Sequence, residues 1–343
     1  METLSSISAH NLAEAAPSTK RASISIALCT YNGARFLEAQ LDSFLAQTRL
    51  PDEVVACDDG STDDTLAILE RFEKCAPFPV RIVRGEGRLG STKNFEKVIG
   101  LCTGDLIATS DQDDVWMPDK LALSEAAIAI ELGRGLIFTD ADVVDENLDP
   151  LGHTMWDAMR FSHEGRRRVR QGLAFEMLLR QWLVTGATMM FRSEYRPFIF
   201  PIPENWVHDG WIAFIIAALA PLGFVERSTV KYRQHAAQQI GGKKLTWRET
   251  YRRAREVGPP QFRLDYQRFL LAQERLRSLA ARVRDPRFLS LVGKKVEHQR
   301  RRLAIVEASS RWKRVIWTLG EMGHGGYTRY SPRFTHFIKD MFF

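Results

Sequence analysis

Cysteine is scarce in this chain of 343 residues, which contains four cysteines and no CxxC pair. They stand apart from one another, at Cys29, Cys57, Cys75 and Cys102. Disulfide frameworks and cysteine zinc sites need regularly spaced cysteines, so the sequence argues against both. We expect buried thiols in a reducing compartment.

A long apolar segment is also missing. The longest apolar stretch, residues 211–225, contains Pro221 and Gly223 and is shorter than the roughly 20 residues that span a bilayer. We expect a buried helix there. Residues 1–20 lack the basic start and apolar core of a secretory signal. We therefore expect a flexible N-terminal tail over residues 1–21 and a cytoplasmic protein.

Charge is distributed unevenly along the chain, although the net charge is only +6. Residues 1–240 contain 24 basic and 33 acidic side chains, whereas residues 241–343 contain 24 basic and 9 acidic ones. The change predicts an acidic domain over residues 22–240 and a basic C-terminal region over residues 241–343. Apolar residues at helical spacing predict that the basic region is α-helical and faces a polyanion or an anionic membrane surface.

Short apolar segments alternate with helical patterns in the first part of the chain, which predicts an α/β fold. The strand candidates are residues 23–29, 53–57, 79–83, 106–109 and 136–139. We expect a doubly wound, mostly parallel sheet flanked by helices. Carboxylates follow three of these segments, at Asp58 and Asp59, at residues 111–114, and at Asp140 and Asp142. In a parallel sheet they would gather along one edge, where ligands bind.

The densest acidic group lies in residues 105–118, where Asp111, Asp113 and Asp114 follow an apolar strand candidate. Carboxylates this close repel one another, and a hard divalent cation with oxygen ligands would offset the repulsion. The alternative is an acidic turn before a helix, with Asp114 as the helix cap. This stretch alone favours neither interpretation.

Phosphate-binding glycine motifs do not explain the chain. The loop at residues 85–90 is rich in glycine, but it lacks the lysine of a P-loop and does not match GxGxxG. We therefore predict neither a P-loop nor a Rossmann dinucleotide site.

Four motifs in this order resemble the family 2 glycosyltransferases, which have the GT-A fold. They are Thr30-Tyr31-Asn32, the sequence DDGSTD at residues 58–63, the sequence SDQDDVW at residues 110–116, and VHDGW at residues 207–211. Together with YRQH at residues 232–235, the sequences of these motifs are most similar to those of the rhamnosyltransferase-type branch, which assembles bacterial surface polysaccharides. The resemblance covers roughly residues 22–240 and implies an inverting transfer from a nucleotide-diphosphate sugar to a hydroxyl.

The resemblance also implies roles for individual residues on the donor side. The nucleotide would be held by Thr30, Tyr31, Asn32, Asp58, Asp59 and Asp111, since carboxylates accept hydrogen bonds from pyrimidine N–H groups and ribose hydroxyls. Asp111, Asp113 and His235 would hold Mg²⁺ or Mn²⁺ on the diphosphate, beside which Arg233 would pair with a phosphate.

On the acceptor side, the resemblance makes Asp209 the general base that takes the proton of the attacking hydroxyl. The alternative is that Asp209 caps the following helix. Trp116, Gly186 and His208 would line the acceptor site, although Trp116 also fits a packed core and Gly186 a simple turn. His208 stands where much of the family has glutamate, which weakens the general match and favours the rhamnosyltransferase-like branch.

The expected partners follow from the same resemblance. They are a donor linked to dTDP or UDP, a glycan or lipid-linked acceptor, and an anionic membrane surface that holds the basic region peripherally. Residues 334–343 would insert into the membrane or dock elsewhere. We expect no nucleic acid. A sugar-1-phosphate nucleotidyltransferase and a non-enzymatic nucleic-acid-binding protein remain as alternatives, but the first needs a basic glycine-rich loop after its first strand, and the second leaves the carboxylates unexplained.

Overall fold

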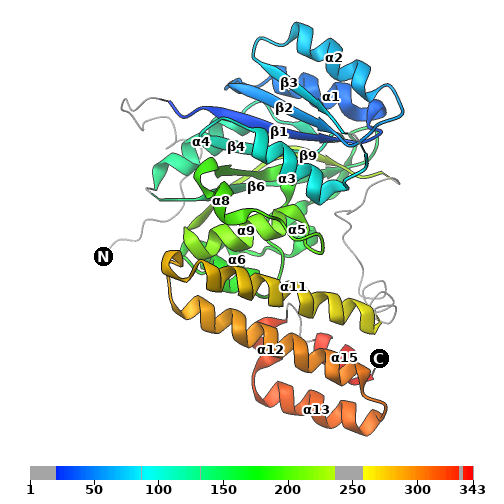
Figure 1. Cartoon of the computed structure of the whole chain (residues 1–343), viewed down its shortest axis with the longest axis vertical. Helices are drawn as coiled ribbons and strands as arrows, with labels where there is room; N and C mark the ends of the chain where they lie inside the picture. Colours follow the sequence, from blue (N-terminus) through cyan, green and yellow to red (C-terminus); the bar gives the residue numbers. More distant parts are fainter. Residues whose placement is uncertain (1–20, 86, 132, 236–257, 332–334, 343) are drawn as a thin grey trace.

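A computed structural model describes residues 21–85, 87–131, 133–235, 258–331 and 335–342. Within these residues a sheet covered by helices forms one part of the molecule, and a set of helices from the end of the chain forms the other (Figure 1). The predicted tail over residues 1–21 lies almost entirely outside the described residues. The predicted boundary at residue 241 also lies outside them.

The described residues form one sheet of nine strands, in the order β3-β2-β1-β4-β8-β6-β9-β5, with β7 paired to β6. The strands are β1 (Ile24–Thr30), β2 (Glu53–Asp58), β3 (Val80–Arg84), β4 (Leu106–Ser110), β5 (Val115–Trp116), β6 (Leu136–Val144), β7 (Pro150–Thr154), β8 (Met189–Arg192) and β9 (Leu222–Arg233). Strands β1 to β4 pair in parallel, as do β6 and β9, and the antiparallel β8 joins the two groups. The predicted α/β fold with a mostly parallel sheet is confirmed.

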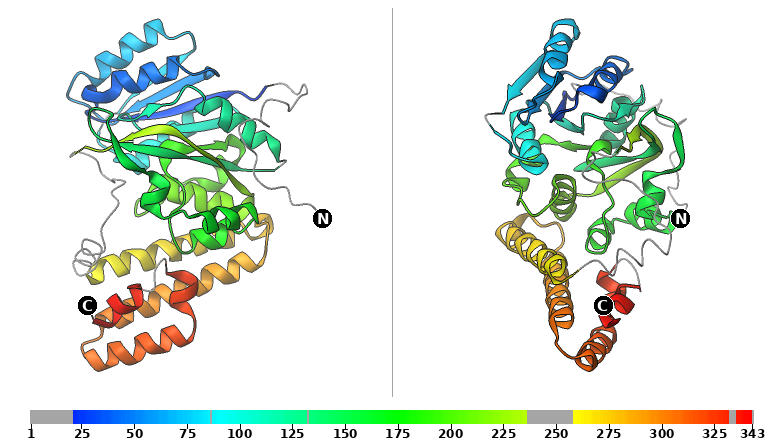
Figure 2. Two further views of the ribbon diagram at one scale, coloured as in Figure 1. Left: turned by 180° about the vertical axis from the view of Figure 1, so that it is seen from behind. Right: turned by 90° about the vertical axis from the view of Figure 1, so that its right-hand side faces the viewer.

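Helices cover both faces of the sheet, as a doubly wound fold requires (Figures 1 and 2). In the sheet domain they are α1 (Ala34–Leu45), α2 (Thr65–Cys75), α3 (Ser91–Leu101), α4 (Lys120–Ile130), α5 (Met155–Met159), α6 (His163–Arg170), α7 (Ala174–Leu178), α8 (Arg196–Ile199) and α9 (His208–Leu219). Apolar side chains of α1, α2 and α4 form one core with the sheet, and those of α3 and α9 form another on its opposite face.

The long apolar stretch at residues 211–225 is a helix followed by a strand. Helix α9 buries nearly all of its residues and ends at Leu219, and Pro221 separates it from strand β9. Proline lacks a backbone N–H and cannot continue the helix, so the predicted buried helix is confirmed only for the first part of the stretch. Among the described residues, no helix is long and apolar enough to cross a membrane.

Strand β6 is longer than the sequence pattern indicates, and this corrects the expected position of two acids. It continues through Asp140 and Asp142 to Val144, so these residues lie within the sheet and not at its edge. The Asp140 carboxylate accepts hydrogen bonds from the backbone N–H groups of Ala141 and Trp156, at 2.8 and 2.9 Å. Its role is to hold the start of α5 against the sheet.

The basic C-terminal region is helical, as predicted, and comprises α11 (Pro259–Ser278), α12 (Arg287–Glu307), α13 (Arg311–Gly323), α14 (Gly326–Tyr330) and α15 (Thr335–Phe342). Helix α11 packs beneath the sheet domain near α9, and α13 lies at the far end of the molecule (Figure 1). Ala272, Leu276 and Val292 join the same core as α9. The two regions therefore share one apolar interface.

The expected insertion of residues 334–343 into a membrane is not supported by the part of that segment that the structure describes. Asp340 of α15 is buried and forms an ion pair with Arg302 of α12, at 2.5 Å. The ring of Phe337 packs against Tyr327. Helix α15 thus docks on its neighbours, which was the alternative expectation.

Candidate active site

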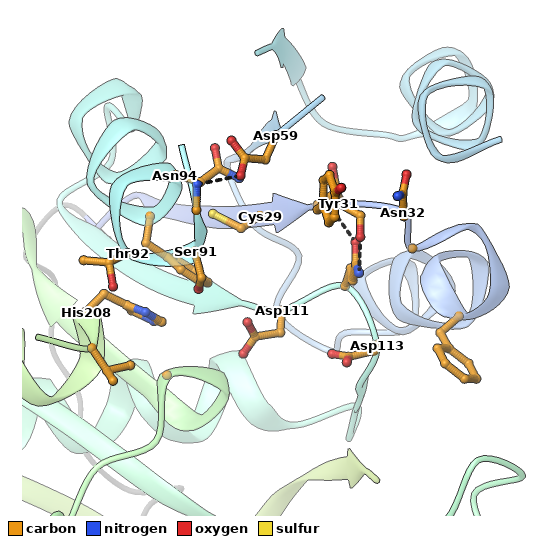
Figure 3. A pocket seen from close by; sticks show the side chains of 18 of the residues that line it. Cys29, Tyr31, Asn32, Asp59, Ser91, Thr92, Asn94, Asp111, Asp113 and His208 are labelled. Carbon is orange, nitrogen blue, oxygen red and sulfur yellow. Dashed lines mark hydrogen bonds between the residues drawn. The ribbon is translucent and has the colours of Figure 1, made fainter. Parts of the chain in front are cut away.

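A cavity of about 720 Å³ opens where β1, β2 and β4 end (Figure 3). It is lined by residues of the β1–α1 loop, the start of α3, the segment after β4, the segment before β8 and the start of α9. Ten of the residues to which the family resemblance assigns a role line this cavity, namely Thr30, Tyr31, Asn32, Asp59, Asp111, Asp113, Gly186, His208, Asp209 and His235. The cavity therefore opens at the sheet edge where the carboxyl-end rule for parallel sheets predicts ligand binding.

Gln112 fixes the loop after β1 to the loop after β4. Its Oε1 accepts from the backbone N–H of Tyr31 at 2.7 Å, and its Nε2 donates to the Tyr31 carbonyl at 2.9 Å. Asn32 has a φ of 47°, and its Oδ1 accepts from the backbone N–H of Thr62 at 2.8 Å. Arg88 lies over the Tyr31 ring, 4.3 Å from its centroid. The Tyr31 ring and the Arg88 charge thus form one wall of the cavity.

Asp58 and Asp59 are neighbours in the chain but have separate positions. The Asp59 carboxylate lines the cavity and accepts from the backbone N–H groups of Leu89 and Gly90, at 2.6 and 2.8 Å. The Asp58 carboxylate points away, because it accepts from Thr30 Oγ1 at 2.8 Å and from the backbone and hydroxyl of Ser61. Asp59 therefore lies at the cavity, whereas the hydrogen bonds of Asp58 stabilise the turn that follows β2.

Asp111 and Asp113 both face the cavity, and they differ in their partners (Figure 3). The Asp113 Oδ2 lies 2.7 Å from Nε2 of His235, a pair that the sequence places far apart. Burial, and then the negative charges of Asp113 and Asp209, raise the pKa of Asp111 to about 8. The negative charges of Asp113 and Asp209 therefore both act on Asp111, and a bound cation would offset them.

Asp114 and Arg233 lie behind the cavity. The Asp114 carboxylate is buried and accepts from the backbone N–H of Arg233 at 3.0 Å, while α4 begins only at Lys120, so the expected capping role is wrong. Arg233 is 4% exposed and its Nε donates to the Asp113 carbonyl at 2.8 Å. Its guanidinium therefore supports the loop that carries Asp113, and the structure does not bring it to the cavity surface.

Asp209 lies in the first turn of α9, between the helix and the segment before β8. Its Oδ2 accepts from the Gly186 N–H at 2.9 Å and its Oδ1 from the Gly210 N–H at 2.6 Å. Burial raises the pKa of Asp209 to about 6 in spite of these bonds. The alternative that Asp209 caps α9 is wrong, because the N-cap residue is Val207 and Asp209 lies within the first turn, where the helix N-terminus favours a negative charge.

His208 is buried at 4% exposure and stacks on Phe95, with 3.7 Å between the ring centroids. Neither ring nitrogen has a hydrogen-bond partner among the described residues, and burial lowers the pKa of His208 to about 3. The imidazole is therefore neutral at physiological pH. It lines the cavity beside Gly186, where a Cβ would lie 2.6 Å from the His208 Nε2. A side chain at position 186 would therefore have to displace the packed His208 ring.

We expect Gly186→Ala to destabilise the fold by about 1–3 kcal/mol, because the added methyl group must displace the packed His208 ring. Urea denaturation measures this difference. Gly320→Ala is a matched control in α13, where an added Cβ meets no atom within 4 Å, and it should not lower stability. Equal stability of the Gly186→Ala variant and the native chain would contradict the packing argument.

Trp116 does not reach the cavity. It is 2% exposed and packs against Phe44 of α1, with 4.8 Å between ring centroids. The expected role of Trp116 in the acceptor site is therefore wrong, and the alternative that it packs in the core is confirmed. The sequence reasoning also missed Gln112, Arg88 and the start of α3 at Ser91. The glycine-rich loop before α3 is the sequence signal for Arg88 and Ser91, and Gln112 lies within the motif at residues 110–116.

The donor set suits a hard or borderline cation, although it is incomplete by itself. Asp113 and His235 offer a carboxylate oxygen and an imidazole nitrogen on one side of the cavity, and Asp111 adds a second carboxylate. Among the described residues, no three His, Cys, Asp or Glu side chains converge on one point. A divalent cation here would need ligand oxygens from a bound phosphate to complete its shell.

Comparison with known families gives an independent result. Residues 25–178 match the family described as Glycosyl transferase family 2. An uncharacterised glycosyltransferase of Nostoc, alr2836, is 27% identical over 219 residues, which cover 62% of this chain and 65% of that protein. The dTDP-rhamnosyl transferase RfbG of Shigella flexneri is 27% identical over 244 residues, covering 66% of this chain and 77% of that one. The chain therefore matches less than two thirds of the Nostoc protein.

The fold also has a solved counterpart. The crystal structure of residues 1–349 of Staphylococcus aureus TarS in complex with UDP-GlcNAc superposes with a TM-score of 0.55 at 16% identity, covering 89% of this chain and 92% of that one. At this identity the similarity concerns the fold. The coverage of 89% exceeds the share of the chain that the sheet domain occupies, from β1 to the end of β9 at Arg233, so the match extends into the C-terminal helices.

Proposed function

Because the chain belongs to the family 2 glycosyltransferases, which have the GT-A fold, we propose that it transfers a sugar from a nucleotide-diphosphate sugar to a hydroxyl, with inversion at the anomeric carbon. One observation carries the proposal most strongly: Asp209, with its pKa raised to about 6, shares a single cavity with Asp59, Asp111 and Asp113. A base and a donor site therefore face the same space. The family assignment favours glycosyl transfer over a nucleotidyltransferase and over a non-enzymatic nucleic-acid-binding protein.

In this proposal the nucleoside binds between the β1–α1 loop and the loop before α3. Thr30, Tyr31 and Asn32 supply backbone and ring contacts, and Asp59 accepts from the base. Arg88 stays beside the Tyr31 ring and adds a positive charge for a phosphate. A dTDP or UDP donor fits these groups, and the name of the Shigella relative supports dTDP-rhamnose as the first donor to test.

Asp113 and His235 would hold Mg²⁺ or Mn²⁺, with Asp111 beside them, and the diphosphate of the donor would supply further ligands. When bound, such a cation offsets the negative charge that grows on the departing diphosphate. The protein's own contribution is positional: Arg233 fixes the Asp113 backbone from behind, and the Asp113–His235 pair holds both side chains toward the cavity.

Asp209 would act from the acceptor side. As the acceptor oxygen forms its bond to the anomeric carbon, the bond to the diphosphate breaks, and the hydroxyl proton passes to the Asp209 carboxylate. A pKa of about 6 keeps this group ionised at neutral pH while making it a stronger base than an exposed aspartate. Neutral His208 and Gly186 shape the wall beside it. One carboxylate and one displacement invert the anomeric centre.

The experiment that tests the proposal is a panel of nucleotide-diphosphate sugars. Thermal unfolding would be measured with each donor, with Mn²⁺ and with EDTA, and sugar transfer would be followed on glycan and lipid-linked acceptors. We expect stabilisation by donors of one nucleotide class that depends on the cation. Absence of stabilisation and of transfer with every donor would contradict the proposal.

We further propose that the protein binds peripherally to an anionic membrane through α13. Lipid-linked acceptors would be available to it at that membrane. Four large apolar residues of this helix are exposed, namely Trp312 (77%), Ile316 (64%), Trp317 (46%) and Leu319 (46%). Arg311 and Lys313 are exposed on the same helix. Apolar side chains with neighbouring basic ones are typical of helices that lie in the interface of an anionic bilayer.

We expect the double variant Trp312→Ala/Trp317→Ala to bind vesicles of anionic phospholipid at least tenfold more weakly, since two exposed rings no longer enter the interface. Vesicle sedimentation measures the effect, and vesicles of neutral lipid give the charge contribution. Leu89→Ala removes a large apolar side chain that is 49% exposed elsewhere and serves as the control. Equal binding by the double variant and the native chain would exclude α13 as the membrane contact.

A further inference from the structure

A second cavity, of about 400 Å³, lies between the sheet domain and the C-terminal helices. It adjoins the proposed active site directly. Thr185 and Asp209 line the first cavity, whereas their chain neighbours Val184 and Gly210 line the second. The second cavity therefore begins one residue away from the proposed general base.

Trp182 forms the wall at this junction. A Cβ on Gly210 would lie 1.9 Å from Cζ3 of Trp182, so the ring rests directly on the backbone of α9. The ring is 41% exposed, and its centroid lies 6.1 Å from that of Trp206. With Phe269 of α11, these rings give the cavity an aromatic surface of the kind that packs against sugar rings or hydrocarbon.

The charged side chains of this cavity are mostly basic. Arg180, Arg268, Lys295 and Arg302 line it, against one carboxylate, Asp265. Two of these cations already have partners: Arg268 lies 3.4 Å from Asp265, and Arg302 forms an ion pair with Asp340. The charge that remains is carried by Arg180 and Lys295.

No ion pair joins Arg180 or Lys295 to a carboxylate in the part of the chain that the structure describes, and Asp265 acts on the charge of Lys295 only from a longer distance. Lys295 is 4% exposed; its Nζ donates to the Tyr330 carbonyl at 2.7 Å and lies 4.6 Å from the centroid of the Phe269 ring. Burial, and then the charges of Arg302 and Arg180, lower the pKa of Lys295 to about 7. Burial also lowers the pKa of Arg180.

Lys295 is therefore only partly protonated at neutral pH, and an anion bound between it and Arg180 would hold it in its charged form and complete the electrostatic arrangement. We propose that this cavity binds a phosphate or diphosphate group of the acceptor, with Arg180 and Lys295 on the anionic oxygens and the aromatic wall on the adjoining sugar or hydrocarbon. The acceptor hydroxyl then reaches Asp209 past Trp182. The inference rests on the proposed glycosyl transfer and names the acceptor class for it.

The test measures binding of two probes in EDTA by calorimetry: inorganic pyrophosphate and farnesyl diphosphate. Arg180→Gln should weaken both at least tenfold, and Arg180→Lys, which keeps the charge, should restore most of the affinity. Arg277→Gln removes an exposed charge from α11 and is the matched control. Tighter binding of farnesyl diphosphate than of pyrophosphate supports a lipid-linked acceptor, and equal affinities support a phosphorylated glycan without lipid. Wild-type affinity in Arg180→Gln would overturn the proposal, as would a native chain that binds neither probe.

Transfer kinetics separate this inference from the proposed function. For a diphosphate-bearing acceptor, Arg180→Gln should raise the acceptor KM at least tenfold while kcat and the donor KM stay unchanged. If the acceptor KM is unchanged but the enzyme transfers sugar, the inference fails and the proposed function stands. If the native chain transfers no sugar while Arg180-dependent probe binding persists, the proposed function fails and the anion site stands.

Discussion

Asp209→Asn is expected to lower kcat for sugar transfer by roughly 10²–10⁴-fold, because in the proposed mechanism the acceptor hydroxyl loses the group that takes its proton. The cavity wall around residue 209 should change little, since asparagine has the same shape as aspartate. Its Oδ1 can still accept a hydrogen bond from one of the two backbone N–H groups, of Gly186 and Gly210, that donate to Asp209. Donor affinity should stay within about twofold, because the proton transfer belongs to the acceptor side. Steady-state transfer and equilibrium donor binding, measured on the same preparations, give the two values.

The pH dependence gives a readout that a structural role would not produce. The carboxylate acts as a base only when it is ionised, so kcat should fall as pH decreases through about 6, the raised pKa of Asp209, and level off above it. The Asn variant should lose this limb along with most of its rate. A variant with near-native kcat, or one that keeps the acid limb, would contradict the assignment of the base.

Asp113→Ala is expected to weaken cation-dependent binding of the nucleotide-diphosphate sugar at least tenfold. The substitution removes the carboxylate that pairs with His235 at 2.7 Å and leaves one carboxylate, Asp111, on that side of the cavity. Binding of the free nucleoside should be unchanged, since Tyr31 and Asp59 lie on another wall. Calorimetry with the intact donor and with the nucleoside separates the two contributions.

The controls for this experiment lie in the same chain. Asp149→Ala removes an exposed carboxylate from the turn before β7 and should bind donor normally. EDTA should weaken donor binding by the native chain and have little further effect on Asp113→Ala. If EDTA leaves native donor affinity unchanged, the cation has no part in donor binding and the role of Asp113 must be revised.

Much of the fold follows from local patterns in the sequence. The apolar runs that became β1, β2 and β4 end in polar residues, and the rule that ligands bind beyond the carboxyl ends of parallel strands placed the cavity correctly. The antiparallel strand β8 was not recognised as the element that joins the two parallel groups. Its pairing is set by contacts between residues distant in the chain, and the four residues of β8, MMFR, carry no information about strand direction.

The sequence does not predict in which direction each side chain of the site points. Asp58 and Asp59 are consecutive, yet Asp59 faces the cavity and Asp58 closes a turn with Ser61, because consecutive residues at a strand end point to opposite sides. Arg233 and Trp116 are likewise close to cavity residues in the sequence, but their side chains are buried and do not reach the cavity. The second cavity depends on α11 and α12 packing near α9, a tertiary contact with no local signal.

The most direct test of the central claim is the anomeric configuration of the first product, determined by nuclear magnetic resonance with the donor that the panel identifies. A single displacement in this cavity, with Asp209 as the proposed base, predicts that the configuration at the anomeric carbon is inverted relative to the donor. A product that retains the donor configuration would require a second displacement or another route and would contradict the account.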